Sequence, residues 1–469
     1  MQDASGFADS HRFAKLQLKW PERLLGPRPT LKQITVVCWL QLAAFFIFFL
    51  AVYGNQMRHG TGMFSEFRDF IYLYGDGQIF NEYPASRRYD YSLQAQVFSQ
   101  IVPSSKSWFF WPSPYPPFVA MFFGLFARLP YKEAYCLWLG ISLCLYIAGI
   151  RFALATIFPR NSFKGSLILF FALANSAFLS QTLINGQLAS VAVFSVGLAI
   201  YLEDRSYALY SGLALSLLLY KPTLLILIVP MLLLTRRFRA LGGFSMGAAI
   251  VAAFSTAIDG PGIWLAYVRF LGLFGHVVGL TDTPEVTLAH DPSLPRLAHF
   301  PSQERFAHYV DLASISQRMG RGGSTLGMTL LIGTASAVLM MMGLLLWKSR
   351  YANRHVQLLA WATTLTWTLL LNVYVPIYDT VLAVIAITLV LGALTDFGSR
   401  AVTGWVTVLS LAIFVASWKT VEITQQFGIP VLSILLFILG SAELYLLHRE
   451  IRGRQVHETS PEVFCQAIM

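Results

Sequence analysis

The chain has 469 residues, of which 56% are hydrophobic and only 12% are charged. A soluble domain carries about twice that charged fraction, and apolar runs long enough to cross about 30 Å of hydrocarbon recur along this sequence. Because these runs are continuous rather than alternating, they exclude a β-barrel and predict an all-α membrane protein that crosses the bilayer many times. The net charge of +10 comes from short basic clusters beside the apolar runs, which is the pattern of cytoplasmic turns and predicts no nucleic-acid partner.

Taken in order, the chain opens with polar and basic residues 1–31, which we interpret as a cytoplasmic tail. A first membrane helix is expected at about 31–53, followed by a long polar loop at about 54–117. Apolar segments then alternate with short turns, apart from a second polar stretch at 259–323. Residues 32–447 are therefore interpreted as one transmembrane domain, and 448–469 as a second cytoplasmic tail.

The basic turns predict the orientation of the chain. Lys348, Arg350 and Arg354 mark one cytoplasmic turn, and the arginines after His448 mark the cytoplasmic end. Counting back from them places both long polar stretches on the opposite face. Two cytoplasmic termini require an even number of spans, and we predict about twelve. The short apolar segment 118–129 is then a re-entrant or interfacial element.

The first polar stretch contains the leading candidates for chemistry. Asp69 is the first choice for a catalytic residue, because a carboxylate at a membrane surface can take a proton from an attacking hydroxyl. Arg87 and Arg88 can hold a phosphate with paired donors. Tyr115 is a candidate for substrate binding, since aromatic rings stack against sugars. Asp90 is a second candidate for substrate binding. The alternative interpretation is a solvated loop with an interfacial aromatic belt.

Lys221 lies beside Pro222 deep in apolar sequence. An ionisable group there is costly and indicates a function, such as facing a lipid phosphate. The alternative is a lysine that reaches the interface from a helix end. Asn185 and Gln187 flank a glycine between two apolar helices, where they can bind a hydroxyl or form a plain turn.

Tyr378 and Asp379 lie between two predicted helices on the face of the first polar loop. Asp379 can supply a second carboxylate to the site, or it can cap the helix that follows. In the second polar stretch, residues 302–319 are expected as an amphipathic helix over the active site, with Ser302 as its N-cap. His290, His299 and His308 are spaced by nine residues, which is no metal-ligand spacing.

No Gly-x-Ser-x-Gly elbow, P-loop or dinucleotide fingerprint occurs in the sequence. A serine hydrolase and an ATPase are therefore not expected, and the energy for any reaction must come with the substrate. We expect no cofactor, and the sequence neither requires nor excludes a divalent metal.

A set of short motifs occurs in order over most of residues 60–395. The motifs are Asp69-Phe70, Tyr89-Asp90, Tyr115-Pro116-Pro117, Leu129-Pro130-Tyr131, Asn185-Gly186-Gln187, Tyr220-Lys221-Pro222, Arg236-Arg237-Phe238-Arg239 and Pro376-x-Tyr378-Asp379. In this order they resemble glycosyltransferase family 87, which includes mycobacterial mannosyltransferases that use polyprenol-phosphate-mannose.

The resemblance implies the C-type fold of integral-membrane transferases, with an acid of the first outer loop, here Asp69, as catalytic base. It implies a polyprenyl-phosphate sugar donor, with mannose as the sugar, and a lipid or glycan acceptor. Transfer would invert the sugar carbon, and Lys221 or an arginine such as Arg87 or Arg88 would balance the leaving phosphate. Some relatives use a histidine in a later outer loop; residues 376–379 contain none, and the choice among the three histidines of the second stretch stays open.

Two other classes of function fit parts of the sequence. A transporter or flippase of a lipid-linked saccharide is favoured by the buried Lys221, but such carriers contain inverted repeats, and no repeat is evident. A scaffold that binds a glycan without catalysis is the third interpretation. We expect the protein in a bacterial inner membrane, in contact with lipid, with its active face toward the periplasm.

Overall fold

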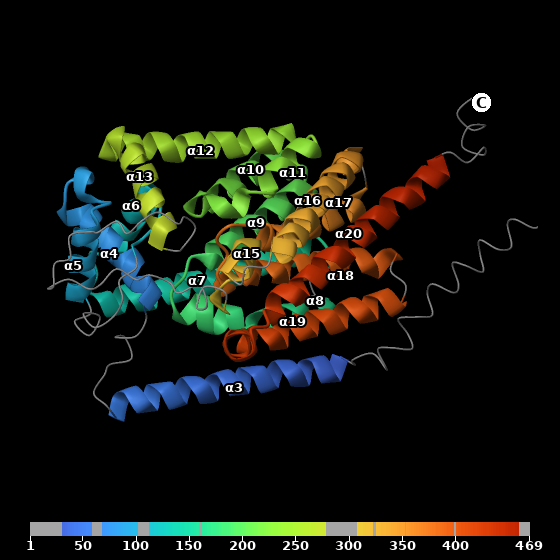
Figure 1. The fold of residues 1–469 in the computed structure, drawn as a ribbon, viewed down its shortest axis with the longest axis horizontal. Coiled ribbons are helices and arrows are strands. Elements are labelled where there is room, and N and C mark those ends of the chain that lie inside the picture. Colours follow the sequence, from blue (N-terminus) through green and yellow to red (C-terminus); the bar gives the residue numbers. More distant parts are fainter. Residues whose placement is uncertain are drawn as a thin grey trace, which may run out of the picture.

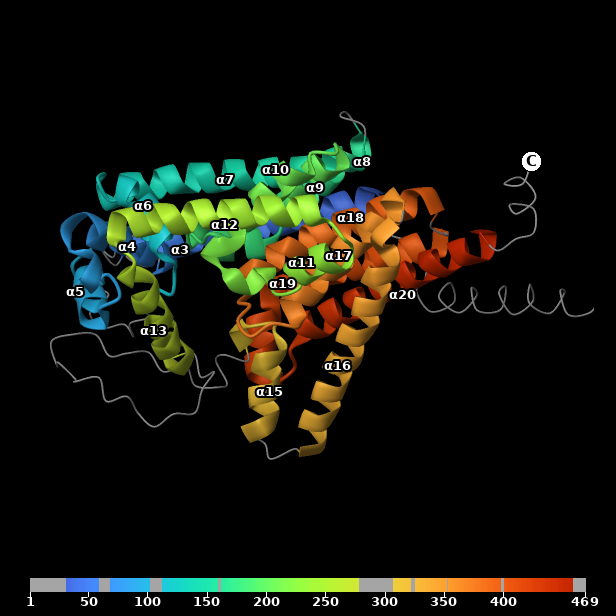
Figure 2. The same cartoon turned by 90° about the horizontal axis from the view of Figure 1, so that it is seen from above.

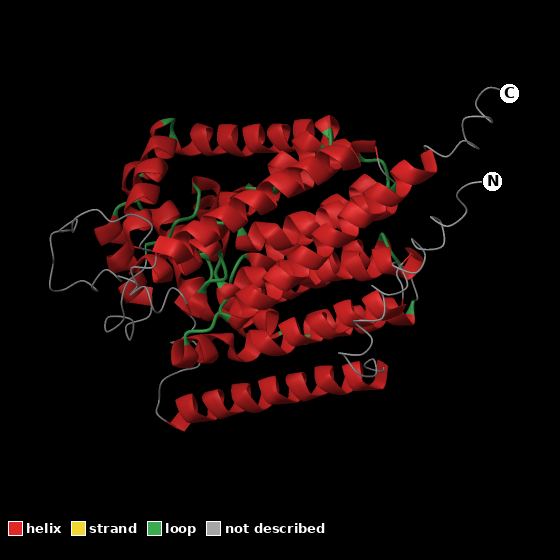
Figure 3. Cartoon of the chain, turned by 45° about the vertical axis from the view of Figure 1, so that its right-hand side comes forward, coloured by secondary structure: helices red, strands yellow, loops and turns green. Residues whose placement is uncertain are grey.

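The structure is a computed structural model, and it describes residues 31–58, 68–101, 112–158, 162–277, 307–321, 325–351, 353–397 and 400–458. These residues form helices and connecting turns (Figure 3), and an isolated antiparallel bridge between Tyr309 and Pro376 is the only β-type pairing among them. Residues 1–30 of the predicted N-terminal tail, residues 278–306 and 322–323 of the second polar stretch, and residues 459–469 lie outside the described residues. The all-α prediction is confirmed for the described part of the chain.

The first half of the chain contains the helices that surround the first polar stretch and the broken helices that follow it. Their bounds are α3 Leu31–Arg58, α4 Arg68–Glu82, η2 Ala85–Arg87, α5 Tyr91–Ile101, α6 Pro117–Phe126, α7 Tyr131–Ala155, α8 Phe163–Leu173, the π-helix η4 Ala177–Ile184, α9 Ala189–Asp204, α10 Ala208–Leu215, η5 Ser216–Tyr220, η6 Pro222–Leu225 and α11 Ile228–Leu234.

The second half begins with a long apolar helix and ends with the helices of the central bundle. Their bounds are α12 Phe238–Asp259, α13 Gly262–Val277, α15 Leu312–Arg321, α16 Thr325–Lys348, η7 Ser349–Tyr351, α17 Arg354–Leu370, η8 Ile377–Val381, α18 Leu382–Phe397, α19 Arg400–Phe427 and α20 Val431–Glu458. The last helix continues past residue 447, where we expected the C-terminal tail to begin.

Six helices of the described chain are long and apolar enough to cross a membrane, or seven if the bent pair α8 and η4 is one span. The six segments are Tyr131–Ala155, Phe238–Asp259, Thr325–Lys348, Ile377–Leu394, Val402–Phe427 and Val431–Arg452. Large apolar side chains are exposed along these helices, for example Ile250, Phe254 and Met340. Exposed apolar faces of this length need lipid around them, so the protein is an integral membrane protein.

Figure 1 shows α12 along one edge of the molecule and α3 along the opposite edge, with α4, α5, α6 and α13 gathered at one end. Seen from above, α15 and α16 extend away from the body (Figure 2). The core lies around α17 and α18: every residue from Leu358 to Leu370 is buried, and 89% of the Ile377–Leu394 window is inside the protein.

The first polar stretch differs from the expected loop, because its described part is largely helical. Helix α4 buries Phe70, Leu73 and Tyr74, and the Phe70 ring packs against Phe123 of α6 at 6.2 Å and Tyr135 of α7 at 5.4 Å between ring centroids. Aromatic side chains that we expected to stack on a sugar are thus partly core residues. Their burial fixes α4, and with it the position of Asp69.

The break at Lys221 was predicted and is present. Proline lacks the amide that would continue the helix, and the chain changes from η5 to η6 with Lys221 between them at φ −140° and ψ 81°. A second break separates α8 from η4, where the axis bends by 56°. Broken helices inside a bundle expose backbone and polar side chains to the interior, so they indicate where a polar ligand can be held.

Candidate active site

The centre of the candidate site is an ion pair between residues 158 positions apart. Lys221 Nζ donates to Asp379 Oδ2, and the two residues are 9% and 1% exposed. The ammonium also lies 4.9 Å from the Tyr374 ring centroid and 4.8 Å from that of Tyr378. Contact with aromatic faces partly replaces the water that a buried ammonium has lost. The structure therefore joins three of the predicted residues, Lys221, Tyr378 and Asp379, and adds Tyr374.

The loop before η8 brings Asp379 to the break at Lys221. Asn372 Nδ2 donates to the backbone oxygen of Thr223 at 2.9 Å, which joins the loop to η6. Proline at 376 precedes the 3₁₀ turn η8, whose first residues carry Tyr378 and Asp379. The alternative role for Asp379, an N-cap of α18, is not its observed contact, because its Oδ2 accepts from Lys221.

Asp311 completes this group, and the sequence analysis did not choose it. It is fully buried and interacts electrostatically with both Lys221 and Asp379. Its Oδ1 accepts from the Ser314 amide at 2.9 Å, and its Oδ2 accepts from the Val375 amide at 2.7 Å. Asp311 therefore caps α15 and ties it to the loop that carries Asp379. We call Lys221, Asp379, Asp311, Tyr374 and Tyr378 the Lys221 cluster.

Some polar atoms near Lys221 have no hydrogen-bond partner among the described residues. They are Asp379 Oδ1, the Tyr220 hydroxyl and Thr223 Oγ1, and all are buried. A buried polar group without a partner costs about 1–3 kcal/mol. Native proteins keep such groups where a ligand or water completes them. The break at Lys221 therefore has the donors and acceptors of a binding site for a polar, charged group.

Tyr115 connects this cluster to the first polar stretch. Its hydroxyl donates to Gln187 Oε1 at 3.3 Å. Burial raises its pKa well above the ordinary value, and the charges of Asp69, Tyr374 and Asp379 raise it further. Burial likewise raises the pKa of Tyr374 to about 12, with contributions from Asp379 and Asp69. Both carboxylates therefore act on the same two tyrosines, from α4 on one side and η8 on the other.

Asp69 lies in the first turn of α4 and is partly buried. The turn Asn185-Gly186-Gln187 fixes its neighbour Phe70: at Gly186 φ is +72°, and a Cβ there would lie 2.7 Å from the Phe70 Cβ. Only glycine fits such a turn without strain. Trp138 Nε1 donates to the Gly186 oxygen at 2.8 Å and holds the turn in place. Asn185 is the residue that ends the π-helix.

The other candidates of the first stretch have different partners. Arg87 pairs with Asp90 at 2.8 Å on the surface, and Asp90 Oδ1 accepts from the Ser92 and Leu93 amides at the start of α5. These bonds outweigh the effect of burial and lower the pKa of Asp90. Asp90 is thus a helix cap, and neither residue has a contact with the Lys221 cluster.

Arg88 is buried and pairs with Asp259 at the end of α12. Its guanidinium also lies 4.1 Å from the Phe80 ring centroid. Burial lowers the pKa of Arg88, and the charge of Asp259 opposes this. Arg88 is thus already paired and covered by a ring, although its Nε and Asp259 Oδ1 have no partner among the described residues.

The structure describes one of the three histidines among which the choice of a base was left open. His308 is exposed, and its charge interacts with Glu422 of α19, while His290 and His299 lie outside the described residues. Among the described residues no three His, Cys, Asp or Glu side chains are grouped as a metal ion would require. The sequence analysis left metal dependence open, and it stays open.

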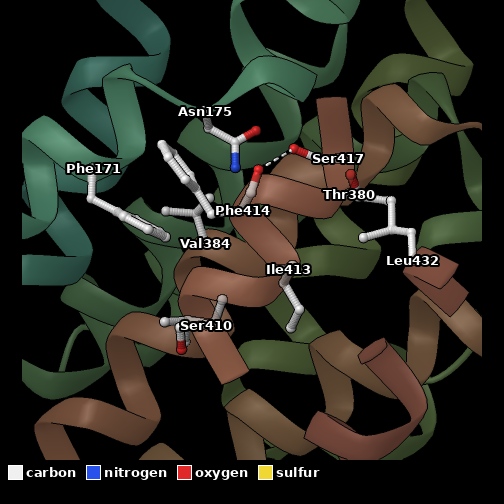
Figure 4. A pocket seen from close by; sticks show the side chains of 11 residues that line it. Phe171, Asn175, Thr380, Val384, Ser410, Ile413, Phe414, Ser417 and Leu432 are labelled. Atoms are coloured by element: carbon white, nitrogen blue, oxygen red, sulfur yellow. Dashed lines mark hydrogen bonds between the residues drawn. The ribbon is translucent and has the colours of Figure 1, made fainter. Parts of the chain in front are cut away.

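A small cavity lies behind η8 (Figure 4). Its volume is about 10 Å³, enough for a single water molecule. Asn175, Thr380, Ser410 and Ser417 contribute its polar lining. Asn175 Oδ1 accepts from the Ala177 amide at 2.9 Å and caps the π-helix. A cavity of this size admits no sugar, so we assign it to the packing of η8 rather than to the site.

Comparison with known families agrees with this geometry. No curated protein and no solved structure matches the chain. The model of glycosyltransferase family 87 matches residues 114–376, which is more than half of the sequence. The matched range includes Tyr115, Gln187 and Lys221; Asp69 precedes it and Asp379 follows it. The chain therefore belongs to glycosyltransferase family 87 and is a membrane glycosyltransferase.

Proposed function

We propose that the protein transfers a hexose, mannose by its resemblance, from a polyprenyl-phosphate donor to a lipid or glycan acceptor, with inversion at C1. The observation that carries this proposal is the convergence of Asp69 and Asp379 on Tyr115 and Tyr374, next to the buried Lys221. Asp69 offers a base. Lys221 offers a cation, and hydroxyls close to it in the chain have no partner among the described residues. Inverting transfer from a lipid phosphate needs both.

In the proposed reaction, Asp69 takes the proton of the acceptor hydroxyl. The hydroxyl oxygen forms the new bond to the sugar C1, and the bond from C1 to the phosphate oxygen breaks. The electron pair leaves with polyprenyl phosphate, whose charge rises by one unit. Lys221 stabilises that charge where it develops, which lowers the barrier.

The ion pair with Asp379 does not prevent this role. An ammonium has three N–H donors, and Asp379 Oδ2 takes one of them. The hydroxyls of Tyr220 and Thr223, which flank Lys221 in the chain and have no partner among the described residues, are the further donors that a phosphate needs. Asp379 in turn balances the charge of the Lys221 ammonium, because a buried cation without an anionic partner is costly.

With this function we propose the C-type fold, with about twelve membrane-spanning segments. We propose that the protein lies in a bacterial inner membrane and that its site is on the periplasmic face. Support comes from the short and broken helices α8 to α11, which add partial spans to the six long ones. Support for the face comes from Asp69, Tyr115 and Asp379, which belong to segments predicted on the same side.

The test is sugar transfer in proteoliposomes that contain labelled polyprenyl-phosphate-mannose and a lipid and glycan acceptor extract. Asp69→Asn should lower transfer by about 10²–10⁴-fold, the usual contribution of a general base. The matched control is Glu422→Gln, which changes an exposed acid on α19 and should leave transfer unchanged. Equal transfer by Asp69→Asn and wild type would assign the base elsewhere.

The same experiment tests the transporter alternative, which the buried charge pair of Lys221 favours. If wild type consumes no donor but moves labelled lipid across the bilayer, the protein is a flippase and the transferase proposal fails. If label appears in the acceptor, the transferase proposal stands.

A further inference from the structure

The segment that delivers Tyr115 to the site is held by side chains from separate elements. Ser113 Oγ donates to Asp76 Oδ2 of α4, and the Ser113 amide donates to Gln94 Oε1 of α5 at 3.2 Å. Tyr267 of α13 donates to the Pro114 oxygen at 3.3 Å, and Tyr89 donates to the Tyr115 oxygen at 3.0 Å. Consecutive residues of one irregular segment are thus fixed from different directions.

The Asp76 end of this arrangement is rigid. A Cβ at Gly75 would lie 2.2 Å from the Phe98 ring of α5, and a Cβ at Gly77 would lie 2.3 Å from the Phe123 oxygen of α6. The glycines on either side of Asp76 therefore let α4 pack directly against α5 and α6. Asn81 Nδ2 adds a hydrogen bond to the Gly124 oxygen at 2.8 Å.

The position of Asp76 in α4 relates it to the candidate site. It lies seven residues after Asp69 in α4, so the two acids share one face of the helix, two turns apart. Its carboxyl is buried, and its hydrogen-bond partner, Ser113, is two residues before Tyr115. The electrostatic influence of Asp76 reaches both Tyr115 and Tyr89.

We propose that Asp76 is a positioning residue: its buried carboxyl accepts from Ser113 and thereby fixes the segment that presents Tyr115 beside Asp69, and a negative charge buried there makes the segment easier to open. The part of this inference that concerns transfer rests on the proposed function; the part that concerns the segment does not.

The surroundings of Asp76 favour the protonated form. Burial raises its pKa to about 8, although the hydrogen bond from Ser113 acts in the opposite direction. The titratable groups that couple to it are Tyr89 and Tyr115. Arg88 is paired with Asp259. Among the described residues the Asp76 carboxyl has no ion pair, and its hydrogen bond comes from the neutral Ser113.

The sign of the pH effect follows from linkage. When the segment opens, Asp76 meets water and its pKa returns toward the ordinary value of about 3.9. The held state binds the proton more tightly than the open state, so it is most stable at low pH. It loses stability as pH rises from about 4 to about 8 and changes no further above that. Each pH unit within this window makes opening up to about tenfold easier.

Hydrogen exchange measures this opening without any substrate. Residues 112, 114, 116 and 117 are prolines, which have no amide, so the exchanging amides from 112 to 117 are those of Ser113 and Tyr115. The comparison is wild type against Asp76→Asn at each pH from 6 to 9, which cancels the intrinsic pH dependence of exchange. Asparagine keeps an acceptor for Ser113 and does not titrate.

The expected result is that the ratio of wild-type to Asp76→Asn exchange rises severalfold between pH 6 and 8 and is flat above 8. Glu422→Gln should follow wild type. Ser113→Ala should exchange faster than wild type at pH 6, where the hold is strongest. A ratio that does not change with pH would overturn the proposal when thermal unfolding shows that Asp76→Asn is folded.

Transfer assays then test the positioning role. At pH 6 Asp76→Asn should keep wild-type transfer within about threefold, since the hydrogen bond remains, and the ratio of wild-type to variant transfer should fall toward pH 8. Loss of transfer in a variant whose Ser113 amide stays protected would mean that Asp76 takes part in the reaction itself, which contradicts positioning. If wild type transfers no sugar but exchange behaves as expected, the hold stands and the proposed donor is wrong.

Discussion

Two acid–base groups in this protein, one partly buried and one buried, are alike in composition and differ in how many of their polar atoms have hydrogen-bond partners. In the Glu203 cluster, Glu203 Oε2 accepts from Arg237 Nη1 at 2.6 Å and from Trp361 Nε1 at 2.9 Å. The guanidinium of Arg237 lies 5.5 Å from the Trp361 ring centroid. These side chains leave no buried polar atom without a partner among the described residues.

The Lys221 cluster has the same ingredients, an acid, a cation and aromatic rings, but Asp379 Oδ1 and two nearby hydroxyls have no partner. A completed network joins helices and rigidifies the protein, whereas an incomplete one carries an energetic cost that a ligand can remove. We therefore interpret the Glu203 cluster as structural and the Lys221 cluster as the binding site.

The largest expected difference between the clusters is in catalysis. Lys221→Met removes the cation that meets the leaving phosphate, and transfer should fall by about 10²–10³-fold, as when an electrostatic donor is deleted from an active site. It also leaves Asp379 buried without its cation, so stability should fall by about 3–5 kcal/mol.

The double variant Lys221→Met with Asp379→Asn separates these effects. Removing both charges should restore most of the stability, because no uncompensated charge remains, but should not restore transfer. Thermal unfolding and the proteoliposome assay measure the two quantities on the same preparation. Recovery of transfer in the double variant would show that Lys221 serves the fold alone and would remove the contrast with Glu203.

The reciprocal prediction concerns Arg237. Arg237→Met leaves Glu203 partly buried without its cation and should lower stability by about 3 kcal/mol. Adding Glu203→Gln should restore most of it, since the amide oxygen can still accept from Trp361. Transfer per folded molecule should equal wild type in both variants. A loss of transfer that persists at full folding would place the Glu203 cluster in the catalytic machinery.

These contrasts also show how far the sequence could predict the site. Lys221 and Asp379 were identified separately, Lys221 by a charge beside a proline in apolar sequence and Asp379 by its place between two helices. Their pairing was not predicted, because a contact across 158 residues depends on how broken helices pack. The hydrophobicity pattern specifies which segments are buried, but not which of them meet.

Asp311 and Asp76 are buried acids that the sequence did not single out. Asp311 lies among many charged residues of the second polar stretch, where composition does not indicate which carboxylate turns inward. Asp76 lies in the first polar stretch, for which a solvated loop was the alternative interpretation. Helix α4 buries it because glycines at 75 and 77 admit α5 and α6. Arg87 and Asp90 look equally suitable in sequence, yet they pair on the surface.

The smallest expected effect is a change in protein stability. Its sign is opposite to the loss of stability that usually follows when a buried hydroxyl is removed. Thr223→Val and Tyr220→Phe remove buried hydroxyls that have no partner among the described residues. Removing an unsatisfied polar atom should leave the free protein equally stable or more stable, by up to about 1 kcal/mol. Donor binding should weaken about tenfold, the equivalent of about 1.4 kcal/mol, because the phosphate loses a hydrogen bond.

The matched control is Thr235→Val, close by in the chain, whose hydroxyl donates to the Met231 oxygen at 2.7 Å. That substitution removes a satisfied bond, so it should lower stability by about 1 kcal/mol and leave donor binding unchanged. Thermal unfolding with and without polyprenyl-phosphate-mannose gives both quantities, because at a fixed ligand concentration the stabilisation by a bound ligand grows with the logarithm of its affinity. If Thr223→Val behaves as Thr235→Val does, the hydroxyl at 223 serves the fold, and the phosphate site must lie away from the break at Lys221.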